Sequence, residues 1–394
     1  MAEAQQAQFR WRRGALVAMT AAMFLVIMGS TVPSGLFARY QDAWGLDETA
    51  TSYVFAMYAV GVLAALALCG HLADAIGRLP VVLAAVGTSV VSSVVFVFAS
   101  NEPGLYLARL LSGVSVGLAT GSFTAALRER TTPKLGALIS TVVTSSALAV
   151  GPVYSALVAD ASGAPLTAPY ISYGAATALS FVFVALCREV YRPPNERRLA
   201  PRVGVPRSIL KRFAPNATAV FCAYGTNALF QSLIPLAMIV FGATSQLEMA
   251  LATAVMLGTS AITQVAVINY GGSRSLAVGL VVLAVGLVGM AVSLIGVFPA
   301  LFWVATVICG VGQGVSFKAS LANAVDSALP GDEARTTSMY YLVAYLGTGV
   351  PPVIAGLLGG GAAAVSAVAA VVAIIAVATI GYLRAAGQLG YRHG

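Results

Sequence analysis

The sequence GHLADAIGR, residues 70–78, lies between two uncharged apolar runs, 49–70 and 79–101. Each run is about long enough to cross a lipid bilayer as a helix. A tight loop between two such helices needs neither an acid nor an arginine, yet this loop carries both Asp74 and Arg78. Gly70 and Gly77 allow tight turns and a close approach of the flanking helices. This pattern is typical of a membrane protein that moves between two states.

The composition supports a chain that lies mostly in lipid. Of its 394 residues, 59% are hydrophobic and only 9% are charged. A soluble globular domain has about a quarter of its residues charged. The uncharged stretches therefore predict membrane spans, and they show no period-2 alternation of the kind that a transmembrane barrel requires.

The spacing of the charged residues predicts twelve transmembrane helices. Eight uncharged stretches each suit one helix across roughly 30 Å of hydrocarbon. Two longer stretches, 275–317 and 336–383, hold two helices each, separated at Pro299 and at the glycines 359–361. The eight single stretches are 14–38, 49–70, 79–101, 110–127, 135–159, 161–187, 213–247 and 249–273.

The basic residues predict the orientation. They gather before the first helix, between the fourth and fifth helices, and in the segment 188–213, all on one side of the membrane. By the positive-inside rule this side, with both chain termini, is cytoplasmic, and we expect the cell inner membrane. The net charge of +8 reflects this topology and contact with membrane lipid, and no nucleic-acid binding is expected. The opposite loops carry Asp42, Asp47, Glu48, Glu102, Asp160 and Glu248.

The chain divides into two similar halves. The Arg- and Pro-rich segment 188–213 is predicted to be a cytoplasmic linker between six-helix bundles at 1–187 and 214–394. Glycines four residues apart recur in the fourth and tenth helices, and single prolines recur in the first and seventh. An offset near half the chain predicts an all-α fold of two pseudo-symmetric bundles. The repeated residues are Gly113, Gly117, Gly310, Gly314, Pro33 and Pro235.

The spacing G-x-L-A-D-x-x-G-R in residues 70–78 resembles the loop signature between the second and third helices of the major facilitator superfamily. This resemblance implies the major facilitator fold and a carrier that works by alternating access. It also implies that Asp74 and Arg78, with Gly70 and Gly77, form a latch to the other half, near the start of the eleventh helix. His71 and Leu79-Pro80 depart from the family pattern, so the latch is expected to be weaker here.

Arg109 stands inside the fourth expected span, where an arginine is costly unless it faces a cavity, pairs or snorkels to the surface. Its spacing to Gly113 resembles the helix-four motif of the family, which implies a role in proton coupling or in binding substrate charge. Snorkelling is the other interpretation. In the fifth helix, Gly151-Pro152 partly resembles the signature of drug/proton antiporters, although Leu138 and Ala147 replace its other glycines. A plain proline bend is the alternative for this pair.

Few polar side chains occur inside the spans, and they are candidates for a substrate cavity. Asparagine and glutamine in hydrocarbon need hydrogen-bond partners, so contacts between helices are the alternative role. The candidates are Thr31, Ser34, Tyr224, Asn227, Gln231, Gln313, Tyr341 and Tyr345.

No carboxylate lies in the middle of any expected span. Proton-coupled carriers usually place an acid there, because a buried acid can change its charge near neutral pH. Proton coupling would therefore use Asp42, Glu48 or Asp160 on the outer side, or Arg109 with a substrate charge. Facilitated diffusion is the alternative.

No catalytic constellation, metal-ligand cluster or cofactor motif appears in the sequence. We therefore expect a monomeric secondary transporter and not an enzyme. The mostly apolar spans and the Gly-Pro pair favour efflux of a drug-like or amphiphilic compound in exchange for protons. The alternative is an exporter or facilitator of a sugar or other small polar metabolite without proton coupling.

Overall fold

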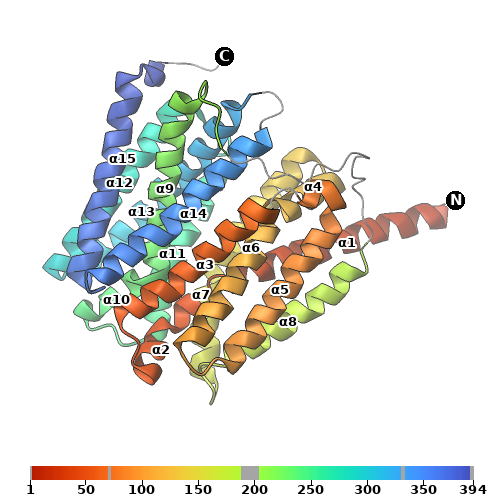
Figure 1. The fold of residues 1–394 in the computed structure, drawn as a ribbon, viewed down its shortest axis with the longest axis horizontal. Helices are drawn as coiled ribbons and strands as arrows, with labels where there is room; N and C mark the ends of the chain where they lie inside the picture. Colours follow the sequence, from red (N-terminus) through yellow and green to blue (C-terminus); the bar gives the residue numbers. More distant parts are fainter. Residues whose placement is uncertain (1, 70–71, 188–203, 330–332, 391–394) are drawn as a thin grey trace.

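The computed structural model describes residues 2–69, 72–187, 204–329 and 333–390, and this part of the chain is helical without a β-strand (Figure 1). Ten of its helices are long and apolar enough to cross a membrane, and two bent helix pairs raise the number to twelve if each pair is one span. The all-helical fold predicted from the sequence is therefore confirmed. Pro299 begins a helix, and glycines 359–361 separate two others, as expected.

The first half contains the helices up to residue 185, and the second half begins at Leu210. The first half consists of α1 (Ala2–Gly29), η1 (Val32–Leu36), α2 (Phe37–Trp44), α3 (Glu48–Cys69), α4 (Leu72–Ile76), α5 (Arg78–Phe98), α6 (Glu102–Arg130), α7 (Pro133–Ala161) and α8 (Ala168–Ala185). The second consists of α9 (Leu210–Ser232), α10 (Ile234–Ala237), η2 (Met238–Phe241), α11 (Gln246–Ala266), α12 (Gly272–Gly296), α13 (Pro299–Asp326), α14 (Glu333–Leu357), α15 (Ala362–Ala385) and η3 (Gln388–Gly390).

The expected linker, 188–213, lies largely outside the described residues, because the description resumes only at residue 204. Its last residues are not linker: Leu210 already begins α9, so residues 210–213 form the first turn of a helix.

The first span of each half is broken. The helix bends by 42° between residues 14–29 and 32–44, and by 54° between Leu210–Ser232 and the segment that follows it. Each break is followed within a few residues by a proline, Pro33 or Pro235. Proline has no N–H and cannot continue the helical hydrogen bonds, so these two residues explain the breaks. Their matching places support the two-fold repeat inferred from the sequence.

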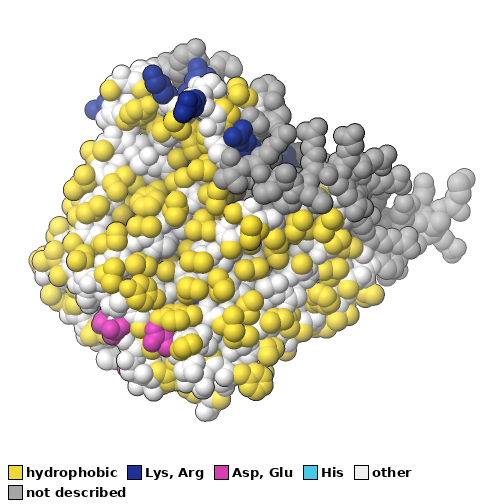
Figure 2. Space-filling view, in the orientation of Figure 1, with side chains coloured by type: hydrophobic (Ala, Val, Ile, Leu, Met, Phe, Trp, Pro, Cys, Tyr) yellow, Lys and Arg dark blue, Asp and Glu magenta, His cyan; other side chains and the backbone are white. Residues whose placement is uncertain are grey.

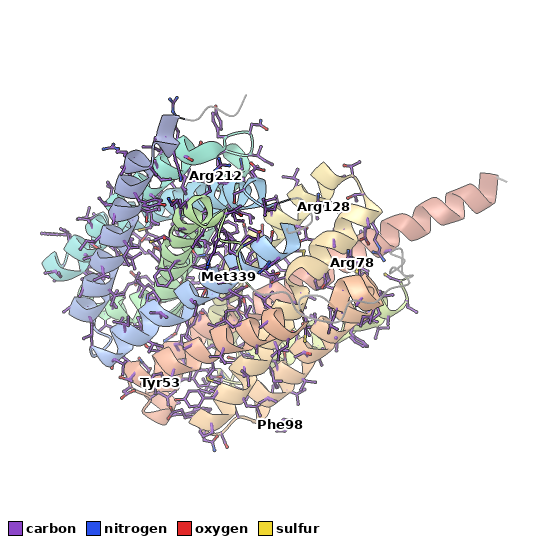
Figure 3. The ribbon with its side chains drawn as sticks, turned by 45° about the horizontal axis from the view of Figure 1, so that its top comes forward. Tyr53, Arg78, Phe98, Arg128, Arg212 and Met339 are labelled. Atoms are coloured by element: carbon purple, nitrogen blue, oxygen red, sulfur yellow. The ribbon has the colours of Figure 1, made fainter. Side chains whose placement is uncertain are left out.

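The two ends of the molecule differ in charge. Dark-blue basic side chains gather at the top of Figure 2 and magenta acidic side chains near the bottom. Arg78, Arg128 and Arg212 lie at one end, and Tyr53 and Phe98 lie towards the other (Figure 3). We call the end with these arginines the basic end and the opposite end the acidic end.

The halves contact each other through α3 and α14 and through α7 and α11 (Figure 1). The hydroxyl of Thr49 donates a 3.0 Å hydrogen bond to the carbonyl oxygen of Gly356, across the boundary between the halves. A Cβ atom added to Gly356 would come within 2.2 Å of the Ser52 hydroxyl oxygen. Only a glycine therefore lets α14 approach α3 so closely near the acidic end.

Candidate functional site

Arg109, on α6, is fully buried at 0% exposure, so the snorkelling interpretation is wrong. Its Nη1 donates a 2.7 Å hydrogen bond to the carbonyl oxygen of Ser30, in the break between α1 and η1. Its Nε and Nη2 atoms have no hydrogen-bond partner among the described residues. A buried guanidinium with two free donors is costly in isolation, and it can bind an acceptor or an anion that reaches it.

Aromatic rings surround this guanidinium. The Cζ atom of Arg109 lies 5.8 Å from the ring centroid of Phe37, 5.1 Å from that of Phe55 and 5.2 Å from that of Tyr58. The negative face of an aromatic ring attracts a cation at such distances, more strongly where water is excluded. Two of the rings come from α3. Helices α3 and α6 meet closely at Gly113, where a Cβ atom would come within 2.1 Å of the Tyr58 carbonyl oxygen.

A row of rings continues from this arginine into the second half. The ring centroid of Tyr58 lies 6.3 Å from that of Tyr345 on α14, and Tyr345 lies 5.6 Å from Tyr224 on α9. Tyr224 in turn lies 5.6 Å from Phe317 on α13. We call Tyr58, Tyr224, Phe317 and Tyr345 the central aromatic cluster. Because its rings come from both halves, any rocking of one half against the other must rearrange it.

The structure divides the predicted cavity residues into groups. Tyr224 and Tyr345 belong to the central aromatic cluster. The ring centroid of Tyr341 lies 5.6 Å from that of its neighbour Tyr340. Asn227 lies one turn after Tyr224 on α9, is 9% exposed, and its Oδ1 has no partner among the described residues. Gln231, a turn further along α9, is buried at 8% exposure.

Gln313 lies on α13, one helical turn before Phe317 of the central aromatic cluster, and belongs to a polar network inside the second half. Its side-chain oxygen accepts a hydrogen bond from Ser260, and Ser260 accepts one from Gln264 at 3.0 Å. These bonds join α11 to α13, which is the helix-contact role left open in the sequence.

Thr31 and Ser34 lie at the break in the first span. Thr31 donates to the Met28 carbonyl oxygen at 3.0 Å and is fully buried. The Ser34 hydroxyl has no partner among the described residues, and it lines a small pocket between the halves together with Ser232 and Gln246. Of the two residues, Ser34 is therefore the one free to bind a further group.

Gly151 and Pro152, the expected bend of the fifth span, pack against the broken first span. A Cβ atom on Gly151 would come within 2.1 Å of the Thr31 hydroxyl oxygen, and one on Gly35 within 2.3 Å of the Pro152 carbonyl oxygen. Pro152 lies inside the continuous helix α7. The Gly-Pro pair thus permits close contact between α7 and η1.

The three outer acids proposed for coupling differ in environment. Asp160 forms an ion pair with Arg39. Asp42 is exposed. Glu48 begins α3 and packs against the other half, since a Cβ atom on Gly360 would come within 2.0 Å of the Glu48 Cβ. Of the three, Glu48 has the clearest contact across the boundary between the halves.

The latch residues are only partly described. Gly70 and the side chain of Asp74 lie outside the described part of the chain. Gly77 has a φ of 105° and precedes α5, a conformation that requires glycine. The Nε atom of Arg78 donates a 3.1 Å hydrogen bond to Glu129 Oε1, an ion pair within the first half. The contact of Asp74 and Arg78 with the start of the eleventh helix stays a prediction.

Two features of the site were missed in the sequence. Glu129, the ion-pair partner of Arg78, stands between Arg128 and Arg130, and its spacing in the sequence gives no signal of that pairing. Helix α6 kinks at Thr120 and at Gly121, where φ is 91°. A glycine inside a span is the sequence signal that could have indicated this kink. Among the described residues, no group of three or more histidine, cysteine, aspartate or glutamate side chains could hold a metal ion.

Comparison with solved structures gives close matches in fold at low sequence identity. The nucleoside transporter NupG, solved as a mutant, matches with a TM-score of 0.69 at 13% identity, over 94% of this chain and 99% of that one. A bacterial homologue of the human lysosomal transporter Spinster matches with a TM-score of 0.70 at 14% identity when inward-facing and unoccupied, over 96% of both chains. The same homologue in its occupied, inward-facing form matches with a TM-score of 0.66 at 15% identity, again over 96% of both chains.

The sequence comparison identifies the family. No curated protein sequence matches the chain significantly. The family profile of the Major Facilitator Superfamily matches residues 19–268, which is more than half of the chain. Together with the apolar helices and the shared fold, this match shows that the protein is a multi-pass membrane transporter of the major facilitator superfamily, and not an enzyme.

Proposed function

We propose that this transporter exports a small amphiphilic, drug-like molecule by alternating access, in exchange for protons. In this proposal the solute binds at the central aromatic cluster, and Arg109 supplies the one strong polar interaction. The observation that carries it is the row of rings between the halves, from Tyr58 to Tyr345 to Tyr224. Beside it lies a buried guanidinium whose Nε and Nη2 atoms have no hydrogen-bond partner in the described part of the chain.

The chemistry of this cluster favours an amphiphilic solute over a sugar. Aromatic faces bind apolar and planar groups, and tyrosine adds a single hydroxyl at the ring edge. A sugar needs several amide and carboxylate partners, and the amides of Gln313 and Gln264 already lie in the network with Ser260. A buried arginine surrounded by rings suits a solute that carries an anionic or hydrogen-bond-accepting group.

A polar metabolite is the second candidate. The Oδ1 of Asn227 has no partner among the residues that the structure describes, and Asn227 lies one turn from Tyr224. It could therefore accept a hydrogen bond from a solute that also stacks on the ring. The structural neighbour NupG bears the name of a nucleoside transporter, and a nucleoside combines a planar base with a polar sugar. At 13% identity that neighbour supports the fold alone, so this candidate rests on Asn227.

Proton exchange is proposed from the position of Glu48 and from the Gly151-Pro152 pair. Glu48 packs against Gly360 of the other half, so opening of the acidic end would change its exposure to solvent and to protons. We place the basic end in the cytoplasm by the positive-inside rule. Efflux would then carry the solute from the basic end to the acidic end while a proton moves the other way.

Flux measurements in proteoliposomes test the proposal. A fluorescent amphiphilic dye, a nucleoside and a hexose are compared with and without an imposed pH gradient, in wild type, Tyr345→Leu and the control Tyr53→Leu. Tyr53 lies on α3 outside the cluster and is 41% exposed. We expect gradient-driven dye flux that falls in Tyr345→Leu and persists in Tyr53→Leu. Flux of the nucleoside or hexose alone, independent of the gradient, would overturn the proposal and favour the polar metabolite.

A further inference from the structure

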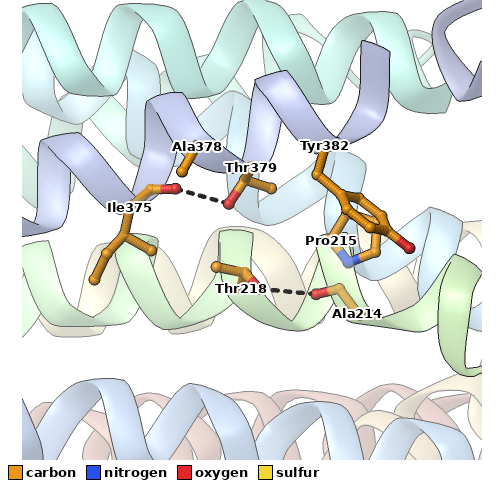
Figure 4. Close-up of a pocket in the computed structure, with 7 residues that line it drawn as sticks. All are labelled: Ala214, Pro215, Thr218, Ile375, Ala378, Thr379 and Tyr382. Atoms are coloured by element: carbon orange, nitrogen blue, oxygen red, sulfur yellow. Dashed lines mark hydrogen bonds between the residues drawn. The ribbon is translucent and has the colours of Figure 1, made fainter. Parts of the chain in front are cut away.

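A groove of about 290 Å³ lies between α9 and α15 (Figure 4), and no residue of the central aromatic cluster lines it. Seven residues line it: Ala214, Pro215, Thr218, Ile375, Ala378, Thr379 and Tyr382. Those on α9 belong to its first turns and those on α15 to its last, so the groove opens near the basic end.

The groove lining is apolar even where its residues carry hydroxyls. Thr218 donates to the Ala214 carbonyl oxygen at 3.0 Å, and Thr379 donates to that of Ile375 at 2.8 Å (Figure 4). Both hydroxyls are therefore satisfied by their own helices. A lining of this kind excludes a polar solute and suits a hydrocarbon chain, which is the solvent around two membrane-spanning helices.

Pro215 explains how α9 and α15 are held together near the groove. Because it has no N–H, it cannot bond the carbonyl oxygen of Lys211 four residues earlier. The Tyr382 hydroxyl and the Gln388 side-chain nitrogen each donate a 3.2 Å hydrogen bond to that oxygen instead. The end of α15 is thus held to the start of α9, with the ring of Tyr382 at the basic end of the groove.

Two basic residues lie in the first turn of α9, next to these hydrogen bonds. Lys211 and Arg212 are exposed, one helical turn before the groove-lining residues Ala214 and Pro215. Neither forms an ion pair with a described residue. Basic side chains at the membrane surface attract anionic lipid headgroups, by about 1 kcal/mol each.

We propose that this groove binds one acyl chain of an anionic phospholipid, whose phosphate contacts Lys211 and Arg212. The apolar lining of the groove matches the acyl chain of such a lipid. The positive charges of Lys211 and Arg212, which no described residue pairs, match its phosphate. A zwitterionic lipid shares the chain but lacks the net charge, so the site should discriminate between the two.

Native mass spectrometry of the purified protein tests this proposal. Phosphatidylglycerol and phosphatidylcholine with identical acyl chains are supplied in equal amounts, and the ratio of the two retained lipids is measured. Wild type should prefer phosphatidylglycerol, and Lys211→Gln with Arg212→Gln should reduce the preference by about 30-fold, the equivalent of about 2 kcal/mol. Ala378→Trp, which fills the groove, should reduce retention of both lipids.

Arg384→Gln is the matched control. Arg384 is exposed on the same end of α15, but it lies two residues after Tyr382 and so about 200° around the helix from the groove. Its loss should leave the lipid preference unchanged. Three results would each overturn the proposal. The first is equal retention of the two lipids by wild type, and the second is a loss of preference in Arg384→Gln as large as that in the double variant. The third is binding of glycerol phosphate, which has no acyl chains, as strong as binding of phosphatidylglycerol. Because Lys211 and Arg212 are exposed, their double variant should fold. Its lipid ratio therefore tests the proposal even if Ala378→Trp does not fold.

Discussion

Arg109 donates a 2.7 Å hydrogen bond to the carbonyl oxygen of Ser30, and this bond joins the fourth span to the break in the first. The carbonyl is free because Pro33, three residues later, has no N–H, and because the N–H of Ser34 bonds Thr31 instead, at 3.0 Å. The proline therefore creates the acceptor that the arginine uses. The bend of α1 and the buried charge form one structural unit.

Replacing Arg109 should affect stability and transport separately. Arg109→Met removes the donor to Ser30 and leaves a buried carbonyl unsatisfied, a cost of about 1–3 kcal/mol. Arg109→Lys keeps a positive charge and a donor but lacks the planar group that stacks on Phe55 and Tyr58. We expect the methionine variant to lose both Tm and flux, and the lysine variant to keep most of its Tm while losing flux. Thermal unfolding in detergent and dye flux in proteoliposomes measure the two effects.

Arg128→Gln serves as the control, because Arg128 is an exposed arginine near the basic end of the same helix. Full flux in Arg109→Lys would mean that positive charge alone is enough. Unchanged Tm and flux in Arg109→Met would contradict any role for the bond to Ser30.

Tyr224 should contribute to solute binding through its ring. It contacts both Tyr345 and Phe317 at 5.6 Å, and each aromatic pair adds about 0.5–1.5 kcal/mol beyond its buried area. Tyr224→Phe should bind the dye as wild type does, whereas Tyr224→Leu should weaken binding by about tenfold. Fluorescence titration of the dye with purified protein gives both affinities. Weaker binding in the phenylalanine variant alone would show that the hydroxyl, and not the ring, recognises the solute.

Gly356 should control closure of the acidic end. A side chain at this position would collide with Ser52. Overpacking of this kind destabilises the packed state by about 1–3 kcal/mol. Gly356→Ala should therefore favour the state in which α3 and α14 separate. We expect the labelling rate of a cysteine at Thr49 to rise by about tenfold. Gly258→Ala on α11 is the control, because a Cβ atom there meets nothing within 4 Å. An unchanged labelling rate in Gly356→Ala would show that this contact does not limit opening.

Glu48 should carry the coupled proton if transport is driven by a pH gradient. Glu48→Gln keeps the size of the side chain but cannot lose a proton, so dye flux should no longer respond to an imposed gradient. Asp42→Asn is the matched control, since Asp42 is exposed at the same end. The measurement is dye flux at several gradients in both variants. A full gradient response in Glu48→Gln would assign coupling to another group.

Asp74 should hold the basic end closed if the loop acts as a latch between the halves. Asp74→Asn should increase labelling of a cysteine introduced at Phe213, near the start of α9 at the basic end. Glu129→Gln provides the comparison, because it removes only the ion pair of Arg78 within the first half. Equal effects of the two substitutions would indicate that the loop stabilises its own half and does not latch the other.

Much of the fold could be predicted from the sequence because lipid imposes strict rules. Charged residues are excluded from the hydrocarbon, so their spacing marks the spans, and Pro299 and glycines 359–361 separate helices where expected. Pro33 and Pro235 likewise indicate the two broken spans, because a missing N–H acts locally.

The partners of the polar side chains depended on tertiary structure. The sequence placed Arg109 inside a span but left open whether it turned outward or inward, and the packing of α6 against α3 decided that it turns towards Ser30. In the same way Arg78 meets Glu129, and Gln313 meets Ser260, from helices distant in sequence. Composition and spacing thus predicted which stretches form long apolar helices and which residues these helices carry. Only the rotation and approach of those helices decided which side chains meet, because such contacts depend on the positions of two segments at once.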